Sequence, residues 1–268
     1  MASFLQSIIA QCKARAGFIV SICAMESVGS DRDAGILWES SSMTQNERSA
    51  VGMNDLFAEV TSAGEMEKLA EGAFLLRSFA AENAKFVVQM VSRIIKVSPF
   101  RHMVTPGGYR MSVAMTNCGR VGWTTGQHGY RYEAIDPETG AAWPPMPLAF
   151  QQLAEMAAER AGFPGFKPDS CLINRYEPGA KLSLHQDRNE KSYESPIVSV
   201  SLGLPAKFLF GGLTRTERPQ RLRLENGDVV VWGGPSRLAF HGVDTLADGD
   251  HPLTGRCRLN LTFRKALS

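Results

Sequence analysis

Two histidines and one aspartate have the types and spacing of a metal site. His185 and Asp187 form a His-x-Asp pair, and His241 follows 56 residues after His185 in Phe-His-Gly. Two imidazoles and one carboxylate on neighbouring strands form the facial triad that binds Fe(II) and leaves positions open for a chelating 2-oxo acid and for oxygen. A His-x-Asp pair is also frequent by chance, and a lone histidine is more often structural, so further residues have to decide.

A second pattern near the end of the chain supplies paired cations. Residues 257–264 alternate strictly, with Leu259, Leu261 and Phe263 on one face of a strand and Arg258, Asn260, Thr262 and Arg264 on the other. An amphipathic strand with its polar face in water explains this pattern. The alternative places the two arginines inside a small barrel, where unpaired cations are costly and require an anionic partner. A dicarboxylate held at both ends by guanidinium groups meets that requirement, and the metal triad favours this alternative.

The elements that would position these residues are mostly short strands. Helical spacing of apolar residues predicts a helix over 86–95, stopped by Pro99, and a second helix over 148–161 with Gly162 at its C-terminal end. Strands punctuated by glycine and proline turns are predicted at 72–79, 171–176, 181–187, 197–204, 207–210, 221–224, 228–232 and 257–264. We therefore expect an α+β protein that is mainly β, built as a sandwich, jelly roll or barrel.

The segment between the two helices differs from the rest. Residues 100–147 show no sustained period but are rich in glycine and aromatic residues, which is typical of a functional loop region. From Asn83 to Tyr132 there is no acidic residue, and the same stretch holds Lys85, Arg93, Lys96, Arg101, Arg110, Arg120 and Arg131. Such a one-sign segment suits an anionic partner such as nucleic acid, although a solvated basic face explains it as well.

Composition bounds the class of protein. The chain has 268 residues, 44% of them hydrophobic and 21% charged, with a net charge of +2. These values exclude a disordered chain or a coiled coil, and no stretch approaches the ~18 apolar residues of a membrane span. The five cysteines are odd in number and show no metal-binding spacing, so we expect free thiols and a cytoplasmic location.

The first 52 residues have a different character. Residues 26–52 are rich in serine, glycine, asparagine and aspartate, and the preceding apolar stretches are too short and too interrupted for a secretory signal. We expect a loosely attached extension over 1–52 and a globular domain over 53–268. A docking extension is the alternative interpretation.

Over residues 53–264 the sequence resembles the AlkB family of Fe(II)- and 2-oxoglutarate-dependent dioxygenases that repair alkylated nucleic acids, and its bacterial founding type in particular. The resemblance rests on long runs, which are much more specific than the metal triad alone. They are MVTPGGY (103–109), MSVAMTNCG (111–119), GWTT (122–125), LINRY (172–176), PGAKLSLHQD (178–187), IVSVSLGLP (197–205), FGGL (210–213), GDVVVWGG (227–234) and RLNLTFR (258–264).

The resemblance implies a double-stranded β-helix, or jelly roll, with flanking helices, a core over about 170–265 and a nucleotide-recognition lid over about 100–147. It implies that His185, Asp187 and His241 bind Fe(II), and that the cosubstrates are 2-oxoglutarate and O2. The residues implied for 2-oxoglutarate are Asn174, Tyr176, Arg258, Asn260 and Arg264, and those for the substrate are Trp123, Tyr130, Tyr132, Asn189 and Arg215. The substrate would be single-stranded or locally melted alkylated DNA or RNA, and we expect a monomer that acts without a membrane.

One position departs from the bacterial pattern. The second residue after Asp187 is usually an aspartate that faces the exocyclic amine of the lesion, and here it is Asn189. Asparagine keeps a carbonyl acceptor but lacks the charge, so the preferred lesion is open. Two other functions remain as alternatives: an oxygenase of the same chemistry that acts on a small molecule or protein, and a non-catalytic jelly roll that binds damaged bases.

Overall fold

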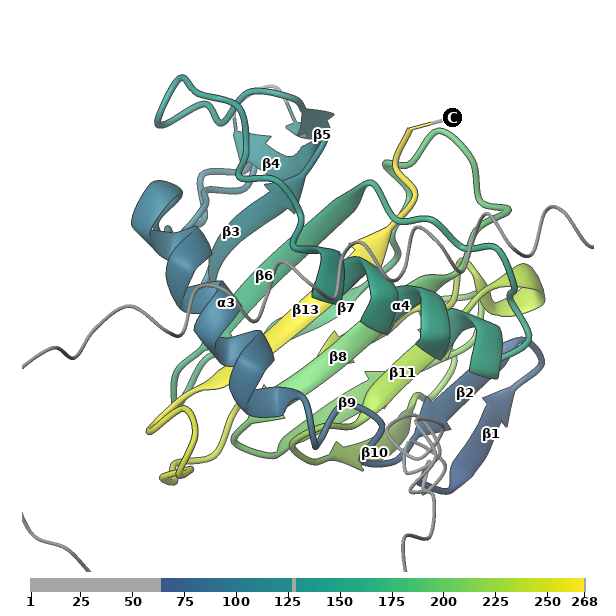
Figure 1. Cartoon of the computed structure of the whole chain (residues 1–268). Helices are drawn as coiled ribbons and strands as arrows, with labels where there is room; N and C mark the ends of the chain where they lie inside the picture. Colours follow the sequence, from purple (N-terminus) through teal and green to yellow (C-terminus); the bar gives the residue numbers. More distant parts are fainter. Residues whose placement is uncertain (1–63, 127–128, 268) are drawn as a thin grey trace, which may run out of the picture. The chain divides into compact units, whose positions relative to one another are not determined.

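The computed structural model describes residues 64–126 and 129–267, and the structural statements below concern this part of the chain. Two antiparallel sheets form the body of the domain (Figure 1). The larger sheet has the strand order β1-β2-β11-β8-β13-β6-β3, and the smaller has the order β10-β9-β12-β7. The predicted extension over 1–52 lies outside the described residues.

The strands of the two sheets have the following bounds. In the larger sheet they are β1 Met66–Ala70, β2 Ala73–Leu76, β3 Ala114–Gly119, β6 Ser170–Tyr176, β8 Ile197–Gly203, β11 Val229–Trp232 and β13 Arg258–Arg264. In the smaller sheet they are β7 Leu182–His185, β9 Ala206–Phe210, β10 Gln220–Leu224 and β12 His241–Val243. β4 (Gly122–Gly126) and β5 (Gly129–Glu133) pair with each other, and we call them the lid hairpin. A short 3-10 helix, η2, spans Gly234–Ser236.

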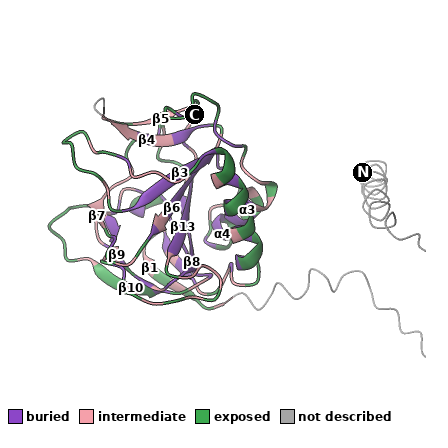
Figure 2. Ribbon diagram, turned by 90° about the vertical axis from the view of Figure 1, so that its left-hand side faces the viewer, coloured by how far each residue is buried: buried purple, intermediate pink, exposed green. Residues whose placement is uncertain are grey.

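Two helices cover one face of the larger sheet, and the smaller sheet covers the other (Figure 2). α3 (Ala84–Val97) and α4 (Leu148–Arg160) lie close to their predicted positions. Gly162 ends α4 with a φ of +87°, and the N–H groups of Gly162 and Phe163 donate to the carbonyls of Glu159 and Ala158. This is a Schellman ending, which a glycine in the left-handed region favours. Neither helix, nor η2, is long and apolar enough to cross a membrane.

Apolar and polar residues alternate along β13, so one face of the strand is apolar and the other is polar. Leu259, Leu261 and Phe263 pack in the core under the helices. Asn260, Thr262 and Arg264 point into the space between the two sheets, where they line a cavity. The jelly-roll fold is thus as expected, and β13 carries the polar residues into its interior.

The prediction of a largely irregular segment over 100–147 is wrong in part. This segment contains β3 and both strands of the lid hairpin, and β3 is an edge strand of the larger sheet that pairs with β6 from Ala114↔Arg175 to Gly119↔Ser170. β3 was missed because five of its six residues are buried, so its side chains show no alternation of polarity. The predicted strand at 72–79 corresponds to β2, and its partner β1, at Met66–Ala70, was not predicted.

Candidate active site

A cavity of about 720 Å³ lies between the two sheets, beneath the lid hairpin. The larger sheet contributes residues of β3, β6, β8, β11 and β13 to its wall, and the smaller sheet contributes residues of β7, β9 and β12. Trp123 and Tyr130 of the lid hairpin also line it. The polar side of β13 and the predicted metal ligands therefore open into one space.

His185 and His241 are direct partners across two antiparallel strands. They pair in the register of β7 and β12, and their ring centroids lie 4.3 Å apart. The backbones of β7 and β12 approach closely beside them. A Cβ on Gly242 would lie only 2.7 Å from the carbonyl oxygen of Leu182, so glycine is needed there. A pairing register between segments 56 residues apart brings the two imidazoles together.

Backbone carbonyls set the tautomer of both rings. Nδ1 of His185 donates to the carbonyl of Ser183 at 2.9 Å, and Nδ1 of His241 donates to the carbonyl of Ala239 at 3.0 Å. Each Nε2 is then left as the lone-pair nitrogen. These Nε2 atoms lie 3.7 and 3.8 Å from the two carboxylate oxygens of Asp187.

Electrostatics keeps His241 and Asp187 in the protonation states that metal ligands need. Burial and the neighbouring His185 lower the pKa of His241 to about 3, so its ring is neutral. Burial alone would raise the pKa of Asp187, but the charge of Arg264 outweighs it and holds the pKa well below its usual range. The ligand atoms of the three residues lie within 4.8 Å of one another. Two imidazoles and one carboxylate at this separation fit a single Fe(II) ion.

The residues predicted for 2-oxoglutarate gather on β6 and β13. Asn174, Tyr176, Asn260 and Arg264 line the cavity. Arg258 lies behind that wall, with its guanidinium 5.1 Å from the centre of the Tyr176 ring, and one of its nitrogens donates to the Ser201 hydroxyl. The two arginines occupy the two ends of the strand, as expected of a clamp on an elongated ligand.

Unsatisfied donors on these arginines test the fit of a dicarboxylate. Among the described residues, Nε and Nη1 of Arg258 and Nη1 of Arg264 are buried without a hydrogen-bond partner. Buried donors in proteins are nearly always satisfied, and an unmade bond to a charged group is expensive. Arg258 also has no carboxylate within ion-pair distance in the described chain, although it is only 1% exposed. The donor set therefore fits 2-oxoglutarate.

The expectation that both arginines are unpaired is wrong for Arg264. Its Nε donates to Oδ2 of Asp187 at 2.7 Å, and its Nη2 lies 2.6 Å from the same oxygen. The predicted metal ligand and the predicted clamp are thus a buried ion pair. The sequence placed them 77 residues apart and contained no sign of this contact.

The predicted substrate residues divide into two groups. Trp123, Tyr130, Asn189 and Arg215 line the cavity, and the rings of Trp123 and Tyr130 stack with centroids 5.5 Å apart and planes 18° from parallel. Asn117 fixes the backbone of Trp123 by two reciprocal hydrogen bonds of 3.0 Å. Tyr132 is different: it does not line the cavity, and its hydroxyl donates to Glu190 at 2.7 Å.

The acid-free segment does not form one basic surface. Arg101 is buried in a bidentate ion pair with Asp136, and Arg131 pairs with Glu133. Lys85, Arg93 and Lys96 lie on the outer side of α3, away from the cavity. Arg110 lines the cavity mouth and Arg120 is exposed beside the lid hairpin. The interpretation of all seven as one electrostatic feature is therefore wrong, because acidic partners from outside the segment fold onto it.

Three further residues near the predicted metal ligands were not among the predicted site residues. The side chain of Gln186 donates to the carbonyl of Leu238. Glu190 and Arg237 form a buried ion pair at 3.2 Å. The position of Glu190 beside the His-x-Asp pair is a weak indication, whereas Arg237 is far away in sequence and carries none.

Known proteins match most of the chain. A family model described as the 2OG-Fe(II) oxygenase superfamily matches residues 72–264. The "Alpha-ketoglutarate-dependent dioxygenase AlkB" of Escherichia coli is 58% identical over 214 residues, which are 80% of this chain and 98% of that protein. A homologue from Caulobacter vibrioides is 45% identical and covers 67% of this chain and 80% of its own length. A solved structure of OsALKBH1 superposes with a TM-score of 0.66 at 30% identity, covering 75% of this chain and all of that one.

Proposed function

The chain belongs to the AlkB family of the 2OG-Fe(II) oxygenase superfamily, and from this premise we propose that it demethylates N-alkylated bases in single-stranded nucleic acid. The proposed substrates are 1-methyladenine and 3-methylcytosine. The proposed role is direct reversal of alkylation damage, and we expect a monomer that acts in the cytoplasm. The observation that carries the proposal is the placement of the stacked pair Trp123 and Tyr130 on the same cavity as His185, Asp187 and His241.

The cavity suits a base that has left its stack. A base inside a duplex cannot reach a metal between two sheets, so it has to be single-stranded or flipped out. Stacking on an aromatic face contributes about 1–3 kcal/mol per base, and Trp123 is held in place by Asn117. Arg110 and Arg215 add positive charge to the wall, which favours the phosphates of the strand.

Each residue of the site then has a task. His185 and His241 would offer Nε2, and Asp187 a carboxylate oxygen, to Fe(II). Arg264 and Arg258 would bind the two carboxylates of 2-oxoglutarate, with Asn174, Tyr176 and Asn260 lining the space between them. When bound, iron and 2-oxoglutarate supply an oxidation in which O2 converts 2-oxoglutarate to succinate and CO2 and hydroxylates the N-methyl group, which leaves as formaldehyde.

The direct test is a reconstitution of the full chain with Fe(II) under anaerobic conditions, followed by 2-oxoglutarate, oxygen and a methylated single-stranded oligonucleotide. We expect formaldehyde and succinate in step with loss of the lesion. His241→Ala should abolish this turnover, because a three-ligand site that loses one ligand no longer holds a competent metal centre. His251→Ala is the matched control, since His251 lies in a turn away from the cavity.

Succinate formed without any loss of the lesion would reject nucleic acid as the substrate and favour an oxygenase for a small molecule or protein. Lesion binding without succinate would favour a non-catalytic binding protein.

A further inference from the structure

Glu190 is buried among cations behind the active-site cavity. Its side chain is only 2% exposed, and Oε2 lies 3.2 Å from Nη2 of Arg237. On the other side, Oε1 lies 3.5 Å from Nε of Arg264. A carboxylate between two buried guanidinium groups is strongly held, because removal of either partner leaves an uncompensated buried charge. Neither Glu190 nor Arg237 lines the cavity, so neither has a role in the function proposed so far.

Arg237 ties this carboxylate to the backbone of the metal ligand. Its Nη1 donates to the carbonyl of Asp187 at 3.1 Å, and its Nε donates to the carbonyl of Ser195 at 3.0 Å. Arg264 holds the side chain of the same aspartate at 2.7 Å. The backbone and the carboxylate of Asp187 are therefore fixed by two arginines that share one counterion, Glu190.

The lid hairpin reaches the same counterion. The hydroxyl of Tyr132, on β5, donates to Oε1 of Glu190 at 2.7 Å. A bond to an ionised acceptor at this length is charge-assisted and roughly twice as strong as a neutral one. A continuous path of named contacts thus runs from β5 through Tyr132 and Glu190 to Arg264.

We propose that Glu190 is a positioning residue that couples nucleic-acid binding at the lid hairpin to 2-oxoglutarate binding at Arg264. This inference rests on the proposed function, because the ligand of the lid is the nucleic acid strand. A strand that holds β5 in place also holds Tyr132, and through it the carboxylate that orients Arg264. Pre-ordering of a binding group lowers the ordering cost for its ligand, and the effect is reciprocal between the two ligands.

Tyr132→Phe tests the coupling because it removes one hydroxyl and keeps the ring. The dissociation constant of 2-oxoglutarate is measured by calorimetry on the Mn(II)-loaded full chain without oxygen, with and without a saturating single-stranded oligonucleotide carrying one 1-methyladenine. We expect the oligonucleotide to tighten 2-oxoglutarate binding about tenfold in the unaltered protein, a usual size for coupling between sites. In Tyr132→Phe the coupling ratio, which is the dissociation constant of 2-oxoglutarate without the oligonucleotide divided by that with it, should fall below about twofold.

Tyr193→Phe is the matched control. It makes the same chemical change in the segment that follows Asp187, where the Tyr193 hydroxyl donates to the carbonyl of Arg188 at 3.0 Å and does not contact Glu190. It should keep the coupling of the unaltered protein. A ratio near one in the unaltered protein, or a tenfold ratio that survives in Tyr132→Phe, would overturn the proposal.

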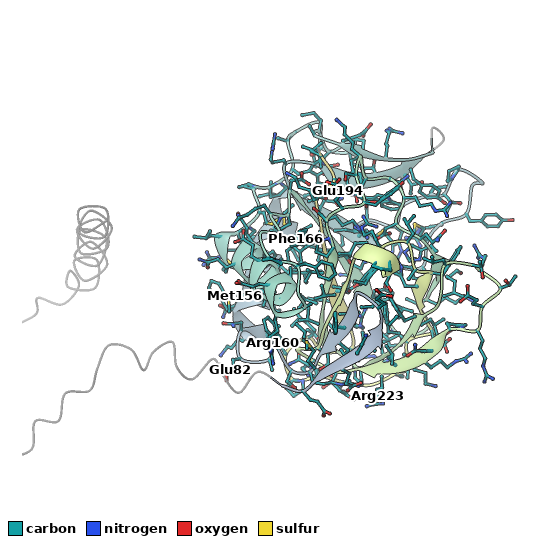
Figure 3. All side chains as sticks on the ribbon, turned by 90° about the vertical axis from the view of Figure 1, so that its right-hand side faces the viewer. Glu82, Met156, Arg160, Phe166, Glu194 and Arg223 are labelled. Carbon is teal, nitrogen blue, oxygen red and sulfur yellow. The ribbon has the colours of Figure 1, made fainter. Side chains whose placement is uncertain are left out.

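Glu190→Gln tests the charge itself, because glutamine keeps an acceptor for Tyr132 but leaves Arg237 without its counterion. We expect the coupling ratio to fall below twofold here as well, together with a lower thermal midpoint. Glu194→Gln is the control, since Glu194 is exposed in the same segment (Figure 3). If Glu190→Gln does not fold, Tyr132→Phe alone decides the matter.

Oligonucleotide binding is measured separately by fluorescence anisotropy. An unaltered protein that binds no methylated strand refutes both the proposed function and the coupling. A protein that binds and demethylates the strand but shows the same ratio in Tyr132→Phe refutes the coupling alone.

Discussion

At the scale of single residues, neighbours decide what each ligand atom of the site can do. The Nδ1 bonds of His185 and His241 to backbone carbonyls leave Nε2 free for a metal. The contact of Arg264 with Asp187 keeps the carboxylate ionised before any metal arrives. Partners of this kind orient the ligands and raise their affinity, and loss of such a partner typically costs about 10–100-fold in metal affinity or activity.

Asn189 is the residue from which we expect an effect on lesion preference. It lines the cavity, its Oδ1 accepts from Nε1 of Trp123 at 3.1 Å, and its Nδ2 donates to the carbonyl of Tyr130 at 3.4 Å. Asn189→Asp keeps an acceptor for Trp123 and adds a negative charge beside a cationic base. The kcat/KM for 1-methyladenine relative to neutral 1-methylguanine should rise about tenfold, the effect of roughly 1.4 kcal/mol from a charge-assisted bond.

Competition between the two lesions in otherwise identical strands measures this ratio, so changes in the metal and 2-oxoglutarate sites cancel. Asn83→Asp, at an exposed position before α3, is the control and should leave the ratio unchanged. An equal ratio in Asn189→Asp and the unaltered enzyme would mean that this position does not sense the charge of the base.

At the scale of elements, the surroundings of the lid hairpin determine which basic residues meet the nucleic acid. Arg110 and Arg120 have no acidic partner among the ion pairs of the described chain, whereas Arg131 pairs with Glu133. Replacement of Arg110 and Arg120 by glutamine should weaken oligonucleotide binding and reduce the slope of log K against log salt by about 1.4, or about 0.7 per lost phosphate contact. The slope is measured by anisotropy over a range of salt concentrations.

Arg93→Gln with Lys96→Gln provides the matched control, because both side chains lie on the outer side of α3 in the same acid-free segment. We expect no change of slope in this pair. If the two double variants behave alike, the cavity mouth has no special part in phosphate binding.

A second prediction at this scale concerns the junction of α3 with the lid. Asp136 accepts hydrogen bonds from Arg101, from Ser98 after the end of α3 and from the N–H of Glu138. Burial alone would raise the pKa of Asp136, but these bonds lower it to about 2. The folded-state pKa lies below the unfolded value of about 3.9, so the junction stabilises the fold above pH 4 and loses this contribution as the pH falls towards 2.

The contribution is about 2 kcal/mol at neutral pH. Urea unfolding of Asp136→Asn should show a loss of at least this size at pH 7 and a much smaller difference from the unaltered protein near pH 2. Glu138→Gln should stay within about 0.5 kcal/mol at both pH values, because its side chain is 62% exposed and such pairs contribute little. A loss in Asp136→Asn that persists undiminished at pH 2 would contradict the assignment.

At the scale of the whole domain, the site depends on both sheets, because strands of each form the walls of the cavity. Glu194, after the proposed metal ligand Asp187, lies towards the lid end, and Arg223 on β10 lies towards the opposite end (Figure 3). The described residues of the domain contain every proposed ligand, clamp and base-stacking residue. We therefore expect removal of residues 1–52 to leave activity intact and to move the thermal midpoint by less than about 2 °C, which corresponds to under 1 kcal/mol.

Differential scanning calorimetry and the formaldehyde assay on the truncated chain check this expectation. A fall of several degrees would indicate that the extension packs on the domain, and a loss of turnover without such a fall would assign it a part in substrate binding.

The sequence by itself determined the features that depend on the order of neighbouring residues along the chain. The alternation of β13 fixes which of its residues face the cavity, since successive side chains in a strand point to opposite sides. The helical spacing and Gly162 predicted α4 and its ending. The His-x-Asp pair and the two arginines were visible because their residue types are rare in an apolar sheet unless they bind something.

Only the tertiary structure decided which distant residues meet. It paired His185 with His241 through strand register, placed Arg264 on Asp187, buried Arg101 against Asp136 and turned Tyr132 from the cavity to Glu190. Register and ion pairing between segments 35 to 77 residues apart depend on how the sheets pack, and no period along the chain records that. The residue types and their spacing in the sequence indicated the chemistry of this protein. The contacts that connect the lid hairpin to the predicted metal ligands arise only when the chain folds.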